Sequence, residues 1–113
     1  MTAFTESSFH ILANVNVPES GNYAFDGAGK DHDSVGLFQQ RPSQGWGGVG
    51  GLMTVDARIF LEAMWKVSSW ETRAPGDVAQ AVQRSEAPGA YGKALGMATD
   101  LCAQYEKRHS FEL

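Results

Sequence analysis

The stretch that decides the fold runs from residue 31 to residue 47 and reads DHDSVGLFQQRPSQGWG. It belongs to a longer segment, residues 14–51, in which hydrophobic periodicity disappears and Gly, Pro, Asn, Asp and Ser dominate. A structureless stretch of this length is uncommon in a small domain unless it contains short strands or carries function. Residues 34–40 fit either a short strand or a helical turn, and the pattern alone does not decide between them.

Outside this segment, the apolar residues recur at the three-to-four-residue spacing that is typical of amphipathic helices. We expect a first helix over residues 2–13 and a second that is capped by Thr54 and continues to about Val67. A short helix follows the turn at residues 75–77, and the last and most regular helix covers residues 91–105. The pattern predicts a mainly α-helical domain of the α+β class with a long glycine-rich loop segment.

The composition indicates one folded domain, which we place at residues 1–113, because the 113 residues include 42% hydrophobic and 11% aromatic side chains. The net charge of −4 gives no attraction to phosphate backbones or anionic membranes, so we expect neither nucleic acid nor a membrane as partner. No stretch reaches the roughly 18 apolar residues of a membrane span, and residues 1–15 lack the features of a signal peptide. Cys102, the one cysteine, cannot form an internal disulfide, and we expect it to be a small buried side chain.

The acidic stretch Asp31-His32-Asp33, together with Asp26 and His10, is a candidate metal cluster because carboxylates and imidazoles are common ligands. Its spacing matches neither the H-E-x-x-H zinc pattern nor the calcium loop D-x-[DN]-x-[DN]-G. A polar turn explains these residues equally well. We therefore predict no metal and no cofactor.

Glu6 is the carboxylate with the most suggestive surroundings. It lies between Phe4 and Phe9, at the end of a predicted helix that faces the glycine-rich segment, in a setting that can desolvate it and raise its pKa. A carboxylic acid that stays protonated near neutral pH is what glycosidic cleavage requires, since the leaving oxygen must receive a proton as the bond breaks. A solvated helix glutamate is the alternative.

Three motifs that follow one another along the chain carry a resemblance to a known family. They are TESSF at residues 5–9, GLFQQ at residues 36–40, and AQAVQ at residues 79–83, the last leading to Pro-Gly at residues 88–89. In this order they resemble the soluble lytic transglycosylase and goose-type lysozyme group. That group has a helix ending in Glu-Ser, a Gly-Leu-Met-Gln-type segment and a later Ala-Tyr-Asn-Ala-Gly segment. Residues 31–47 also resemble a lysozyme-like module of actinobacterial and actinophage proteins, including phage tape-measure proteins, and the whole resemblance covers about residues 2–98.

The resemblance implies a lysozyme-like fold, with helices around a saccharide cleft, and a single catalytic glutamate. Glu6 would protonate the glycosidic oxygen and then, as a base, take a proton from the sugar 6-hydroxyl to close a 1,6-anhydro product. A second carboxylate is not required, because the substrate's own N-acetyl group can stabilise positive charge at the anomeric carbon. Hydrolysis by a water that Asp31 or Asp33 directs stays open.

The chain departs from the family pattern in two places. Where the family has a tyrosine that can orient the glutamate, this chain has Val82 followed by Gln83, and Tyr91 is either its replacement or a core residue. Only five residues precede Glu6, and a glutamate on a fraying helix end is poorly preorganised, so this fragment could fold and yet be weakly active. Trp46 is expected either to stack on a sugar or to anchor its loop in the core. The predicted substrate-binding residues are Gln39, Gln40, Asp33, Trp46, Gln83 and Tyr91.

We therefore expect a lysozyme-like glycosidase, either a lytic transglycosylase or a hydrolase, that cleaves peptidoglycan glycan strands during cell wall degradation. The alternatives are a non-catalytic wall-binding or structural module of a phage tail or secreted protein, and a metal-dependent wall peptidase or amidase. We expect the domain to be excised from a longer protein that delivers it to an extracytoplasmic or virion-associated location.

Overall fold

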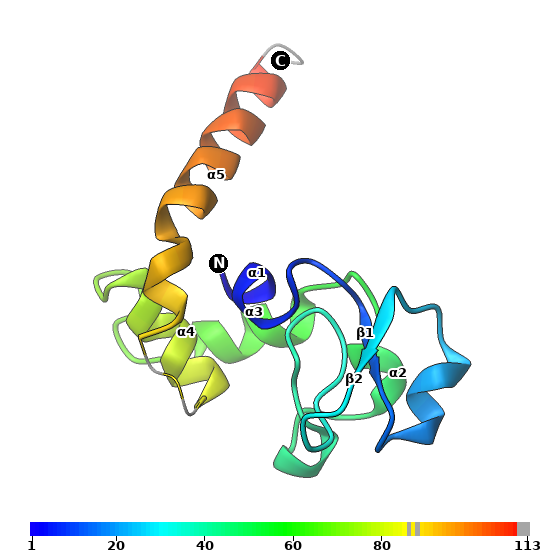
Figure 1. Cartoon of the computed structure of the whole chain (residues 1–113). Helices are drawn as coiled ribbons and strands as arrows, with labels where there is room; N and C mark the ends of the chain where they lie inside the picture. Colours follow the sequence, from blue (N-terminus) through cyan, green and yellow to red (C-terminus); the bar gives the residue numbers. More distant parts are fainter. Residues whose placement is uncertain (86, 88, 111–113) are drawn as a thin grey trace.

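The computed structural model describes residues 1–85, 87 and 89–110 (Figure 1). About half of the chain is helical, and the described residues contain one two-stranded sheet, so the class is mixed α+β. In chain order the elements are α1 (Thr2–Ser7), β1 (Leu12–Asn14), the 3-10 helix η1 (Pro18–Asn22), β2 (Gly27–Gly29), the 3-10 helix η2 (Pro42–Gln44), α2 (Val49–Leu52), α3 (Arg58–Trp65), α4 (Pro75–Gln83), the 3-10 helix η3 (Tyr91–Ala94) and α5 (Leu95–Ser110).

Helix α1 is shorter than the predicted helix over residues 2–13. It ends at Ser7 because Ser8 and Phe9 both adopt left-handed backbone conformations, with φ of 52° and 66°. Their amides donate to the carbonyls of Phe4 and Ala3, which closes the helix end. Leu12, which the helical spacing had included, instead opens β1, and β1 pairs in parallel with β2 from Leu12↔Gly27 to Asn14↔Gly29.

The segment over residues 14–51 forms short elements around a small core, as expected from its length. The buried core residues here are Ala13, Val35, Val49, Leu52 and Met53. Residues 34–40 form neither a strand nor a helical turn but a tight loop, closed by an antiparallel bridge between Val35 and Gln40. At the start of this loop Gly36 has φ of +84°, and a Cβ there would lie 1.9 Å from the carbonyl oxygen of Leu52. Only glycine fits this position.

The helix that follows begins later than predicted. The expected N-cap, Thr54, accepts a hydrogen bond from the Asp56 amide, and Asp56 Oδ1 in turn accepts from the Arg58 amide at the start of α3. Val55 is 77% exposed and is not part of the apolar face that the sequence predicted. Val67 lies beyond the end of α3 at Trp65. The predicted short helix after residues 75–77 is confirmed as α4, whose Val78, Ala79 and Val82 are buried.

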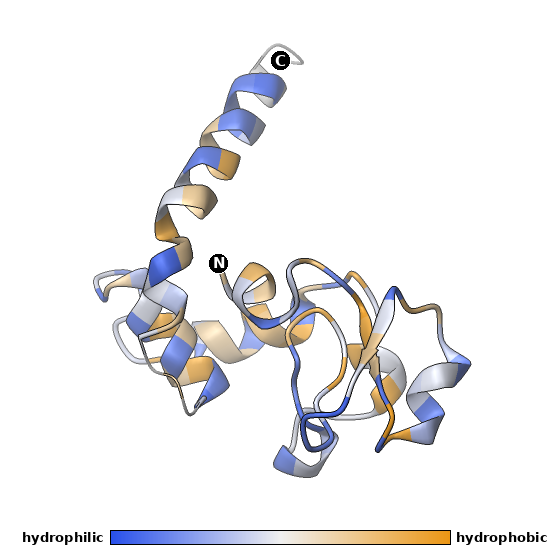
Figure 2. Cartoon of the chain, in the orientation of Figure 1, coloured by the Kyte–Doolittle hydropathy of each residue, from blue (hydrophilic) through white to orange (hydrophobic). Residues whose placement is uncertain are grey.

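The last predicted helix forms, as η3 followed by α5, but its apolar side chains are not all buried. Tyr91 and Ala94 of η3 are buried, whereas Leu101 and Tyr105 of α5 are exposed. Helix α5 projects away from the rest of the molecule (Figure 1), and hydrophilic and hydrophobic residues are mixed along its length (Figure 2). Cys102 is therefore exposed, and the prediction that it would be buried is wrong. Among the residues described, no helix combines the length and apolarity needed to cross a membrane.

Candidate functional site

A pocket of about 190 Å³ opens where α1, the segment of residues 31–46, the end of α4 and the start of η3 meet. Six of the seven residues singled out from the sequence line it, although they come from four separate parts of the chain. These are Glu6, Gln39, Gln40, Trp46, Gln83 and Tyr91. The seventh, Asp33, does not line this pocket.

Glu6 and Tyr91 are joined by a direct hydrogen bond within this pocket. The Tyr91 hydroxyl donates to Glu6 Oε1 at 2.5 Å, across 85 positions of the chain. The Tyr91 side chain is fully buried, so its ring holds the hydroxyl in a fixed place. This hydrogen bond occupies Oε1, so Oε2 is the carboxylate oxygen that Tyr91 does not bind.

The surroundings of this pair change both pKa values. Burial raises the pKa of Glu6, the Tyr91 hydrogen bond opposes this by lowering it, and the nearby negative charge of Asp31 raises it further. The net direction is upward, so the acid form of Glu6 persists to higher pH than in water. Burial and the Glu6 hydrogen bond also raise the pKa of Tyr91 far above its usual value, which keeps its hydroxyl protonated as a donor.

The loop of residues 36–39 is fixed to helices on both sides of the pocket. From α1, the buried Ser7 hydroxyl lies 2.7 Å from the Leu37 carbonyl oxygen and can donate to it. From α4, the Gln83 amide nitrogen donates to the Phe38 carbonyl at 2.6 Å. Gln83 Oε1 accepts a hydrogen bond from the side-chain nitrogen of the buried Gln40 at 2.9 Å. The residues after Glu6 and at the end of α4 therefore position this loop against the carboxylate.

Gln39 and Trp46 are two of the predicted residues that stay partly exposed in the pocket. Gln39 has a left-handed backbone, with φ of 49°, and its side-chain nitrogen donates to the Gly36 carbonyl at 3.0 Å. Its Oε1 is left as an acceptor. Trp46 packs against the core and also lines the pocket, so both roles considered for it from the sequence are compatible with its place.

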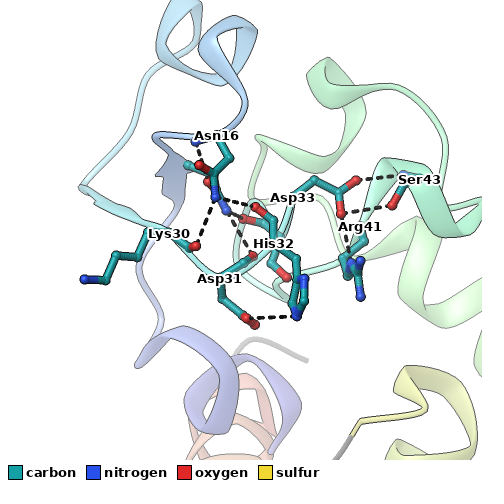
Figure 3. Close-up of polar contacts among 9 residues, drawn as sticks. Asn16, Lys30, Asp31, His32, Asp33, Arg41 and Ser43 are labelled. Carbon is teal, nitrogen blue, oxygen red and sulfur yellow. Dashed lines mark hydrogen bonds and ion pairs between the residues drawn. The ribbon is translucent and has the colours of Figure 1, made fainter.

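The turn at residues 30–34 is held by the side chains of Asn14, the last residue of β1, and of Asn16, which is labelled in Figure 3. The buried Asn14 amide donates to the carbonyls of Asp31 and Ser34, at 3.1 and 2.9 Å. The exposed Asn16 amide donates to the carbonyls of Lys30 and His32, at 3.1 and 3.0 Å. These bonds use the backbone oxygens of the turn, so the Asp31 and His32 side chains remain on the pocket wall.

Asp33 has a different environment from Asp31. Its carboxylate accepts from Arg41 Nε at 2.8 Å, from the Ser43 amide at 2.8 Å and from the Ser43 hydroxyl at 3.0 Å (Figure 3). The Arg41 guanidinium and the Ser43 donors lower the pKa of Asp33 to about 2. Asp33 thus ties the turn to η2 and is a structural group that stays ionised until the pH falls toward about 2.

The metal cluster considered from the sequence does not form. Within residues 1–85, 87 and 89–110, no group of three or more His, Cys, Asp and Glu side chains could hold a metal ion. Asp33 forms an ion pair with Arg41, and Asp26 accepts a hydrogen bond from the Ile11 backbone amide at 2.9 Å. The alternative of a polar turn describes these residues better.

Sequence reasoning did not single out several residues of the pocket wall: Ser34, Arg41, Gln44, Arg84 and Ser85. Most of them belong to the same 31–47 stretch as predicted residues. Their nearness in sequence to those residues was the signal by which they could have been identified. Arg84 and Ser85 follow the AQAVQ motif directly. Their place depends on the left-handed turn at Arg84, where α4 ends, and no local pattern announces that turn.

A comparison with protein-family models gives no match to this chain. A comparison with curated proteins also gives none.

Proposed function

We propose that this protein is a lysozyme-like glycosidase that cleaves the glycan strand of peptidoglycan, with Glu6 as the single general acid and base. The observation that carries the proposal is the Tyr91–Glu6 hydrogen bond inside a pocket lined by amide side chains. Retaining glycosidases of the ordinary kind use two carboxylates about 5–5.5 Å apart. In this pocket the Glu6 carboxylate is held by the buried Tyr91 hydroxyl, and this arrangement suits a mechanism that uses a single carboxylic acid.

The first step uses the protonated form of Glu6. Its raised pKa lets the carboxyl group keep its proton to higher pH than a glutamate in water, and Oε2, the oxygen that Tyr91 does not hold, delivers that proton to the glycosidic oxygen as the C–O bond breaks. The leaving sugar departs as an alcohol and Glu6 becomes a carboxylate. The Tyr91 hydrogen bond stabilises that ionised state and keeps the group aimed at the reaction centre.

The second step uses the carboxylate as a base. In a lytic transglycosylase Glu6 takes the proton of the sugar 6-hydroxyl, whose oxygen bonds to the anomeric carbon and gives a 1,6-anhydro product. The acetamido group of the substrate would stabilise the anomeric carbon between the two steps. In a hydrolase, water takes the place of the 6-hydroxyl, and we assign its direction to Asp31, which lines the pocket. Asp33 is unsuited to this role because Arg41 and Ser43 already use its carboxylate.

Sugar binding is assigned to the polar and aromatic side chains around Glu6. Gln39 Oε1 offers an acceptor to a sugar hydroxyl or amide, and Trp46 offers a ring face, the group that saccharides commonly stack on. Gln40 and Gln83 already bind one another, so they are better suited to positioning the loop than to contacting sugar. We expect the protein to act outside the cytoplasm or on a virion, delivered as part of a larger protein.

The test is release of soluble muropeptides from a purified peptidoglycan suspension. Wild-type protein should release them, and Glu6→Gln, which keeps an oxygen to accept the Tyr91 hydrogen bond, should bind the wall without cutting it. Glu19→Gln is the matched control because Glu19 is exposed and lies 3.5 Å from another tyrosine hydroxyl, that of Tyr23. Equal activity of Glu6→Gln and wild type would refute the role of Glu6.

Two further outcomes separate the alternatives. Binding without cleavage by either protein would identify a wall-binding or structural module. Mass spectrometry of the products distinguishes a lytic transglycosylase, which leaves 1,6-anhydro ends, from a hydrolase, which leaves reducing ends.

A further inference from the structure

A second pocket adjoins the first and shares two side chains with it. Its volume is about 420 Å³, and Trp46 and Arg84 line both pockets, so the two form neighbouring parts of one surface. The second pocket is within the range of about 300–1,000 Å³ that small-molecule sites occupy. A chain molecule that lies in the first pocket could therefore place a side group in the second.

The lining of the second pocket combines aliphatic and charged side chains. The aliphatic part comes from α3 and α4 and includes Ile59, Ala81 and Val82. The charged side chains are Lys66, Arg84 and Glu62. The pocket thus carries two positive charges and one negative charge in a protein whose net charge is −4.

The two cations are placed by the ends of adjacent helices. Lys66 follows the last residue of α3, and Arg84 follows the last residue of α4. Arg84 has a left-handed backbone, with φ of 52° and ψ of 44°, a conformation that is unfavourable for arginine. Its backbone N–H donates a hydrogen bond to the Gln80 carbonyl at 2.7 Å, which holds this conformation. Among the described residues neither cation takes part in an ion pair, so both remain available to an external anion.

From these features we propose that the second pocket binds a carboxylate that peptidoglycan carries beside the glycan strand, through Arg84 and Lys66. This inference rests on the proposed function, because the glycan must occupy the first pocket. Peptidoglycan offers two such carboxylates, those of the stem peptide and the lactyl group that remains on muramic acid when the stem is removed. The guanidinium of Arg84 can bind either with two parallel hydrogen bonds, and Lys66 adds a point charge.

The electrostatic arrangement explains how an acidic protein could bind an acidic polymer. At long range the net charge of −4 repels it, whereas within about 10 Å, the screening length at moderate salt, the local pair of cations dominates. Glu62 works against binding, so its removal should strengthen it. The aliphatic residues would contact the small apolar side chains of a stem peptide.

The experiment measures affinity for soluble glycan strands in the Glu6→Gln background, where cleavage does not interfere. Three substrates are compared: strands with intact stem peptides, strands stripped by an amidase so that lactyl carboxylates remain, and stripped strands whose lactyl carboxylates are converted to amides. Arg84→Gln and Lys66→Met should each weaken binding about tenfold to the strands that present the bound carboxylate, the size expected when one charged hydrogen-bonding partner is lost. Glu62→Gln should strengthen it several-fold.

The matched controls are Arg73→Gln and Lys93→Met, which remove the same charges from residues that line neither pocket and should leave the affinity unchanged. A loss on intact strands that disappears on stripped strands identifies the stem carboxylates. A loss on stripped strands that disappears on the amidated strands identifies the lactyl carboxylate, which intact strands carry only as an amide. A tenfold loss on all three substrates, or no loss on any, overturns the inference. Wild-type protein that binds as expected but never cleaves would instead contradict the proposed function.

Discussion

Gly36 is the position at which the fold of the pocket depends most directly on one atom. The residue has φ of +84°, and an added Cβ would lie 1.9 Å from the Leu52 carbonyl oxygen and 3.0 Å from its carbonyl carbon. The Gly36 amide also donates to the Leu12 carbonyl at 2.8 Å, which joins the loop to β1. Gly36→Ala should therefore displace either the loop or α2.

The expected loss of stability has two parts. A left-handed backbone costs alanine roughly 1–2 kcal/mol, and the collision with fixed backbone atoms adds about 1–3 kcal/mol, as for other overpacked cores. Gly45 separates these parts because it has nearly the same φ, +87°, with nothing within 4 Å of an added Cβ. Gly45→Ala should lose only the first part, about 1–2 kcal/mol, and Gly36→Ala a total of about 2–5 kcal/mol.

The assay is urea-induced unfolding of wild type and both variants, followed by circular dichroism, with the free energy of unfolding extrapolated to water. If Gly36→Ala and Gly45→Ala lose the same free energy, contact with Leu52 has no effect and the reasoning from the close approach is refuted.

Three further predictions concern the charged groups. Tyr91→Phe removes the hydrogen bond that lowers the pKa of Glu6, so the fall in cleavage rate on the alkaline side should move to higher pH and the maximal rate should drop. The control Tyr23→Phe should change neither the pH profile nor the maximal rate. An unchanged pH profile of Tyr91→Phe would contradict the positioning role of Tyr91. Because the pKa of Glu6 is raised in the folded state, that state binds the proton more tightly, and stability is lost as pH rises from the ordinary glutamate value of about 4.3 through the folded pKa. Glu6→Gln should thus be at least as stable as wild type at pH 7, and any advantage should vanish near pH 3, as measured by urea unfolding at both pH values. The contribution of Asp33 to stability depends on pH in the opposite direction, because its pKa is lowered to about 2 in the folded state. Asp33→Asn should destabilise the protein at pH 7, and the difference from wild type should shrink as pH falls from about 4 to 2. Equal stability of Asp33→Asn and wild type at pH 7 would show that the Arg41 pair contributes nothing.

The sequence predicted which residues line the pocket better than it predicted the bounds of the helices and strands around it. Glu6, Gln39 and Gln83 were identified through motifs that lie far apart in the chain, and all three line one pocket. The partnership of Tyr91 with Glu6 was only one of two alternatives, because a hydrogen bond across 85 positions depends on how η3 packs beneath α1. No periodicity predicts such a contact.

The errors in the predicted elements have physical reasons of the same kind. Ile11 and Leu12 continued the helical spacing of residues 2–13, but strand pairing with residues 27–29 and the left-handed pair Ser8 and Phe9 outweighed that local preference. Cys102 belonged to a regular apolar pattern, and burial was inferred from it. Periodicity shows which side chains share a face of a helix but not whether anything covers that face, and α5 projects from the body.

The most direct test of the proposed function is mass spectrometry of the soluble products when wild-type protein and Glu6→Gln are incubated with the same purified peptidoglycan. We expect muropeptides with newly formed 1,6-anhydro or reducing ends from wild type and from the Glu19→Gln control, and none from Glu6→Gln. The same products at the same rate from Glu6→Gln would contradict the assignment of Glu6 as the acid and base of this site.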